Sequence, residues 1–120
     1  MSVRAVRGAI QLDVDEREHL LASTRELVTA VIAANDLTTD DFISILFTCT
    51  PDLHAEFPAV AARELGMGDV PLMCAVEVDV ARAMPRVVRL MAVVETDRPR
   101  SAVQHVYLRG AVALRRDIAQ

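Results

Sequence analysis

The feature that most constrains the fold of this 120-residue chain is a series of short, dense apolar runs. None of them approaches the ~18 consecutive apolar residues of a membrane helix, so they favour the strands of a buried sheet. In the first run, alternation places Val3, Ala5 and Arg7 on one face of a strand. The predicted strands cover residues 3–12, 42–48, 70–76, 86–96, 103–108 and 111–115.

Two helices are predicted between these strands. Residues 16–34 carry apolar side chains at helical spacing, and Asp15 with Glu18 resembles a capping box at their start. Asn35 is a stop signal for this helix, and a shorter helix is expected from Pro58 to Gly66. Because helices and strands do not alternate strictly, we predict a single α+β domain over residues 1–120, with a mixed β-sheet covered by helices on one face.

The composition excludes several classes of protein. A formal net charge of −4 and an aromatic content of 3% argue against nucleic-acid binding, because phosphates would be repelled and few rings could stack on bases. Hydrophobic residues make up 52% of the chain, more than one small core needs, so a homo-oligomer is expected. Two cysteines form no disulfide framework and the N-terminus has no signal-peptide pattern, so a cytoplasmic protein without membrane contact is expected.

Charged residues interrupt the apolar runs at single positions. Arg89 lies within residues 87–94, Glu77 follows the third run, and Arg7 lies in the first. A charge in a buried strand costs several kcal/mol unless it is paired or hydrogen-bonded. These residues therefore face solvent, pair with one another, or line a site for a polar ligand. Arg89 shares its strand face with Met91 and Val93, whose apolar side chains are unfavourable in water. This favours the ligand site over simple exposure to solvent.

An ion pair between Arg89 and Glu77 with a purely structural role remains an equal alternative. Arg63 and Arg115 are by default solvated charges on a helix and a tail. If two or three arginines converge in a dry pocket, however, their planar forks of donors suit carboxylates. Such a cluster beside one glutamate predicts a small ligand that carries carboxylates and a hydroxyl group.

No pattern for a metal site or a covalent nucleophile is present. His54 with Asp52 and Glu56 fits a polar loop before a helix better than a metal site. The chain has no nucleophile elbow, no zinc-protease pattern and no glycine-rich phosphate loop. Neither cysteine has a histidine neighbour in sequence that would support a thiolate. We therefore expect no metal, no cofactor and no covalent catalysis.

Five segments together resemble the small monofunctional bacterial chorismate mutases of the trimeric, barrel-like class. In order along the chain they are residues 3–9 (VRAVRGA), 49–59 (CTPDLHAEFPA), 62–65 (AREL), 70–79 (VPLMCAVEVD) and 105–108 (HVYL). The resemblance implies an α+β domain that forms a homotrimer around a barrel-like centre, with active sites in clefts between subunits. It also implies the cofactor-free Claisen rearrangement of chorismate to prephenate, a step in aromatic amino acid biosynthesis.

The resemblance also implies roles for particular residues. Arg89 matches the arginine that reaches the ether oxygen and a carboxylate of the substrate, and Arg7 with Tyr107 matches a pair that holds a carboxylate. Glu77 and Cys74 match the groups that meet the ring hydroxyl. The remaining matches are Phe57 and Arg63 from the other side of the cleft, Leu72, Met73 and Leu114 as walls, and Arg115 in a segment that closes the site. Val60 departs from the family, because relatives can carry a lysine there.

Two other functions are compatible with the same charged residues. A non-catalytic oligomeric sensor of a small anionic metabolite would bind its ligand through the arginines without turnover. A different enzyme of small acids would use Glu77 as a general base, which requires a transferable proton nearby and a raised pKa for that carboxyl.

Overall fold

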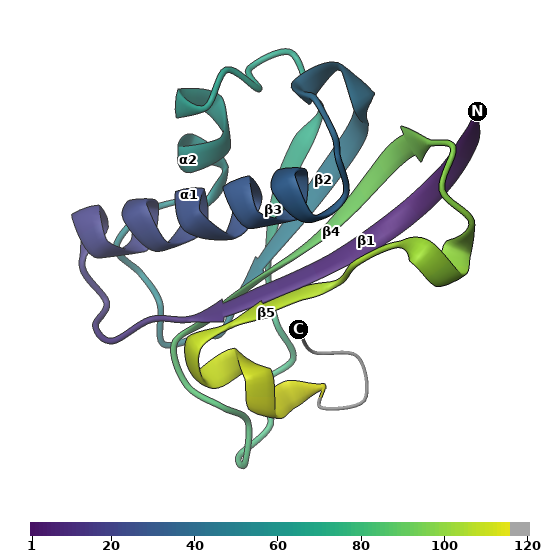
Figure 1. Cartoon of the computed structure of the whole chain (residues 1–120). Helices are drawn as coiled ribbons and strands as arrows, with labels where there is room; N and C mark the ends of the chain where they lie inside the picture. Colours follow the sequence, from purple (N-terminus) through teal and green to yellow (C-terminus); the bar gives the residue numbers. More distant parts are fainter. Residues whose placement is uncertain (116–120) are drawn as a thin grey trace.

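The computed structural model describes residues 1–115, which form a five-stranded sheet with helices packed against it (Figure 1). The strands are β1 (Ser2–Gln11), β2 (Phe42–Cys49), β3 (Leu72–Val76), β4 (Val87–Thr96) and β5 (Val106–Leu108). The helices are α1 (Arg17–Ala34) and α2 (Ala59–Glu64), and three short 3-10 helices are η1 (Thr39–Asp41), η2 (Arg100–Ala102) and η3 (Arg109–Leu114).

The strand order is β3-β2-β4-β1-β5, and the sheet is mixed. β4 lies at its centre and pairs antiparallel with both β1 and β2. The outer pairs, β2 with β3 and β1 with β5, are parallel. The predicted α+β class with a mixed sheet is therefore confirmed.

One face of the sheet carries the main core. α1 and α2 both pack on this side, and α1 crosses the sheet obliquely (Figure 1). The alternate residues Val6, Leu90 and Phe47 point from three neighbouring strands into this layer and are almost fully buried. Because side chains alternate along a strand, the residues between them project from the opposite face, which neither α-helix covers. That second face carries Arg7 and Arg89.

The start of α1 differs from the sequence prediction. The N-cap residue is Glu16, whose carboxylate accepts a hydrogen bond from the His19 backbone N–H at 2.8 Å. Asp15 is instead committed to a loop, because its carboxylate accepts from the backbone N–H groups of His54 and Ala55. The predicted capping box is therefore wrong, whereas Asn35 is confirmed as the C-cap.

The last two predicted strands are also corrected. β5 covers only Val106–Leu108, because the Arg7 backbone N–H bonds the His105 side chain at 3.0 Å instead of continuing the ladder. Residues 111–115 are not a strand. Arg109 adopts a left-handed φ of 55°, which turns the chain into η3. η3 buries Ala111 against Tyr107 on the face opposite α1 and α2, so that face also carries a short helix.

Among the described residues, no helix is both long and apolar enough to cross a membrane.

Candidate active site

A single row of residues crosses all five strands on the face that lacks α-helices. From β3 to β5 the row consists of Ala75, Thr48, Arg89, Ala9 and Tyr107, each paired with its neighbour in the ladder. Thr48 and Arg89 are adjacent in this row and lie between two small alanines, Ala75 and Ala9, and Tyr107 ends the row at β5.

A cavity of about 270 Å³ opens around this row, and we call it the arginine cavity. Its lining residues are Arg7, Gly8, Leu46, Thr48, Arg89, Leu90, Met91 and Tyr107. Arg7 lies opposite Met91 on the neighbouring strand, two positions from the Arg89 row. The sheet register thus brings together three of the residues that the resemblance singles out, Arg7, Arg89 and Tyr107.

Arg89 and Glu77 form an ion pair in this region. The Arg89 Nε atom lies 3.1 Å from Oε2 and 3.2 Å from Oε1 of Glu77. The Glu77 side chain is only 16% exposed, whereas that of Arg89 is 40% exposed. Within residues 1–115, the guanidinium of Arg89 donates hydrogen bonds only through Nε. Its two terminal nitrogens therefore keep their donors for a ligand.

Thr48 completes this cluster, although it was not among the site residues predicted from the sequence. Its hydroxyl donates a hydrogen bond to Glu77 Oε2 at 2.7 Å. The available signal was weak: a hydroxyl residue at the end of the apolar run 42–48, with no indication of which partner it would face.

His105 lies at the Arg7 end of the site. Its Nδ1 accepts the hydrogen bond from the Arg7 backbone N–H. Partial burial, followed by the positive charges of Arg7 and Arg115, lowers the pKa of His105. Arg115 is therefore close enough to act on the same corner of the sheet. Leu114 packs with Tyr107 and Ala111, next to the arginine cavity.

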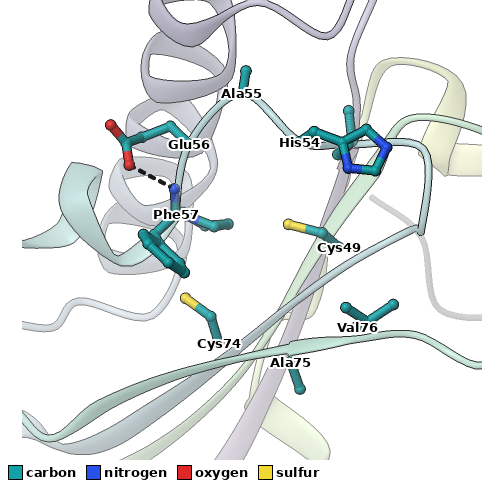
Figure 2. A pocket seen from close by; sticks show the side chains of 10 residues that line it. Cys49, His54, Ala55, Glu56, Phe57, Cys74, Ala75 and Val76 are labelled. Atoms are coloured by element: carbon teal, nitrogen blue, oxygen red, sulfur yellow. Dashed lines mark hydrogen bonds between the residues drawn. The ribbon is translucent and has the colours of Figure 1, made fainter.

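A second cavity, of about 510 Å³, lies between β3 and the loop that leads into α2, and we call it the Phe57 cavity (Figure 2). Its lining residues are Cys49, Leu53, His54, Ala55, Glu56, Phe57, Pro58, Cys74, Ala75 and Val76. Figure 2 shows the sulfur atoms of both cysteines pointing into this hollow, below the loop that carries Phe57. Phe57 is 66% exposed, so it is available to a neighbouring molecule.

The Cys49 thiol lies in an environment that keeps it protonated. Burial raises the pKa of the Cys49 thiol to about 12, with further contributions from nearby Cys74 and acidic groups. A thiol with such a pKa stays neutral at physiological pH and is a poor nucleophile. Within residues 1–115, no three side chains of His, Cys, Asp or Glu are grouped so that they could hold a metal ion.

The remaining predicted residues lie outside the arginine cavity. Arg63 is exposed on α2, on the opposite side of the sheet, with Val60 one turn before it. Leu72 and Met73 lie on the edge strand β3, and Met73 is 67% exposed. One chain therefore does not bring Arg63 near Arg89.

Comparisons with known proteins agree on one family. The family model for chorismate mutase type I matches residues 3–118. The chain is 45% identical to "Chorismate mutase AroH" of Thermus thermophilus over 117 residues, covering 97% of this chain and 96% of the relative. It is 40% identical to the protein of the same name from Bacillus subtilis (strain 168) over 120 residues, covering 99% and 94%.

A solved structure agrees with this result. The chorismate mutase from Clostridium thermocellum superposes with a TM-score of 0.90 at 40% identity, covering 92% of this chain and 98% of that one. Identity at this level over nearly the full length of each protein leaves no large segment of the fold unmatched. The chain therefore belongs to the chorismate mutase type I family.

Proposed function

We propose that this protein is an isomerase that converts chorismate to prephenate by a Claisen rearrangement, without cofactor or covalent intermediate. The observation that carries the proposal is that Arg89, which is paired with Glu77, lines the arginine cavity together with Arg7 and Tyr107. Chorismate has two carboxylates and a ring hydroxyl, which require cationic donors and a carboxylate acceptor. Family membership supports the same assignment.

The first task of the site is to select a compact substrate conformer. The rearrangement is unimolecular, so no nucleophile attacks and no proton has to move. In the productive geometry the side chain of chorismate folds over its ring, and both carboxylates must be held. Arg7 and Tyr107 on one side can hold a carboxylate in that arrangement. The substrate is then bound in a geometry close to the transition state, which raises the rate. Glu77 accepts the hydrogen bond of the ring hydroxyl.

The second task is to stabilise the negative charge that develops on the ether oxygen as its bond to the ring carbon breaks and a new carbon–carbon bond forms between the side chain and the ring. We assign this task to the terminal nitrogens of Arg89, which Glu77 leaves available because it accepts only from Nε. A cation that already points at the oxygen stabilises the transition state more than the ground state. Because the ion pair fixes the guanidinium in advance, little reorganisation is needed during the reaction.

A homotrimer with shared clefts belongs to the same proposal. The sheet face without α-helices exposes Leu46, Met73 and Met91, and such apolar area favours burial between subunits. In the trimer, Phe57 and Arg63 of one protomer would complete the arginine cavity of the next, with Arg63 near a carboxylate. Leu72, Met73 and Leu114 would supply walls, Cys74 would lie with Glu77 near the ring hydroxyl, and Arg115 would help close the site. We place the enzyme in the cytoplasm, which suits two free cysteines.

The test is to mix the purified protein with chorismate and follow the loss of its ultraviolet absorbance, with prephenate identified by chromatography. We expect catalysed turnover with no added metal or cofactor. Binding of chorismate without turnover would replace this function with that of a sensor. A bell-shaped pH–rate profile that reports an essential base would favour the enzyme that uses Glu77 for proton transfer.

Light scattering tests the assembly. We expect the mass of three subunits, because the cavity of one chain lacks the Phe57 and Arg63 groups that its neighbour would supply. Dilution that produces monomers should abolish turnover in parallel. A monomer that retains full activity would contradict the shared cleft while leaving the chemistry of the arginine cavity intact.

A further inference from the structure

We propose that Thr48 is a positioning residue for the rearrangement: its hydroxyl holds the carboxylate of Glu77, and Glu77 in turn holds the guanidinium of Arg89. This inference rests on the proposed function and deepens it. It adds a residue that does not have to touch the substrate. This residue determines where the guanidinium of Arg89, the main cation facing the substrate, points.

The hydrogen bond between Thr48 and Glu77 runs from the hydroxyl to the carboxylate. A carboxylate has no proton to donate, so the Thr48 hydroxyl must be the donor in the 2.7 Å contact with Glu77 Oε2. A hydrogen bond from a hydroxyl to a charged carboxylate is among the stronger side-chain hydrogen bonds. Thr48 therefore fixes one oxygen of Glu77 at a defined place above the sheet.

The donor, Thr48, is itself anchored in the sheet. Thr48 lies within β2 and is paired on both sides, with Arg89 of β4 and Ala75 of β3. Its backbone cannot shift without breaking two ladders, and its β-branched side chain has few rotamers. The hydroxyl is thus carried by a rigid part of the sheet.

The Glu77 side chain needs the support of the Thr48 hydroxyl. Glu77 follows the end of β3, and its backbone is tied to the sheet by one hydrogen bond, from its N–H to the Cys49 carbonyl at 2.9 Å. Its flexible side chain is then held by Thr48 from one side and by Arg89 Nε from the other. Without the hydroxyl, the carboxylate and the guanidinium can move together as a pair.

Thr48→Val tests the inference, because valine has nearly the same shape and lacks only the hydroxyl. We expect kcat to fall ~10-fold or more, since displacement of a catalytic group by a fraction of an ångström is costly in rate. KM should change less than ~3-fold, because the carboxylate contacts of Arg7 and Tyr107 remain. Thr48→Ser keeps the donor and should recover most of the lost kcat.

Thr96→Val is the matched control, because it removes a threonine hydroxyl from β4 far from Glu77, where it accepts a hydrogen bond from the Arg98 backbone N–H. We expect wild-type kinetics from it. Thr48→Ala provides a second variant without the hydroxyl if valine disturbs folding, which thermal unfolding will reveal.

Wild-type kcat in a folded Thr48→Val or Thr48→Ala protein overturns the inference. It is equally overturned if Thr48→Ser is as impaired as Thr48→Val, because the effect would then come from packing. Failure of the proposed function is distinguishable, because it would appear as absent turnover in the wild-type protein, and the role of Thr48 in this reaction would fall with it.

Discussion

Arg89→Ala is expected to lower kcat by at least ~10²–10³, the typical effect of removing one preorganised donor to a developing oxyanion. The loss should be this large because the proposed task of the Arg89 terminal nitrogens is to stabilise the ether oxygen, while Glu77 holds the guanidinium through Nε. The fold should survive, since the Arg89 side chain is 40% exposed and fills no part of the core. Steady-state kinetics and thermal unfolding of the same preparation measure the two effects separately.

Arg89→Lys is the matched control for charge. A lysine ammonium is a single point of charge and cannot both pair with Glu77 and span the ether oxygen and a carboxylate, so kcat should remain low. Turnover near the wild-type rate in Arg89→Ala would show that another group stabilises the oxygen. Full activity in Arg89→Lys alone would show that charge suffices and that the planar fork is not needed.

Mixed trimers of Arg89→Ala and Arg63→Ala chains are expected to recover activity that neither variant has alone. Arg63→Ala should lose at least ~10-fold in kcat/KM, because a substrate carboxylate loses its cation. If each site takes Arg89 from one protomer and Arg63 from the next, random co-assembly of equal amounts gives about a quarter of the sites both intact groups. Co-expression with two affinity tags, followed by kinetics, measures this recovery.

The control for this experiment is co-expression of Arg89→Ala with Arg7→Ala. Both residues line the arginine cavity of the same chain, so no mixture can produce an intact site. We expect no recovery in that pair. Equal recovery in both mixtures would refute the division of the site between protomers, as would the absence of any recovery with Arg63→Ala.

The sequence was sufficient for the parts of the fold that follow from alternation. The alternation of β1 places Arg7 on the face opposite Val6, and that of β4 places Arg89 beside Met91 and away from the core; the structure agrees. The cost of a charge in an apolar strand also led to the Arg89–Glu77 pair, which is present. Strand alternation and the cost of a buried charge were thus enough to predict the residues at the centre of the site.

The parts that the sequence did not predict depend on contacts between distant segments. Residues 111–115 have the apolar character of a strand, but the left-handed Arg109 and its contacts with Ser23 and Glu26 turn them into η3. The role of Thr48 requires knowledge of the β2–β4 register, which no local pattern encodes. The roles of Phe57 and Arg63 follow from the family resemblance alone, and they stay predictions because one chain does not test a site proposed to lie between protomers.

The position of β1 has a consequence for the order of events during synthesis. β1 is synthesised before the other four strands, yet both of its neighbours in the sheet, β4 and β5, lie beyond residue 86. Its backbone donors and acceptors therefore stay unpaired with other strands until most of the chain has been synthesised. Such long-range pairing slows folding. Nascent chains that stall before β4 emerge would carry an unpaired apolar strand, so this enzyme should depend on chaperones more than a helical protein of equal length.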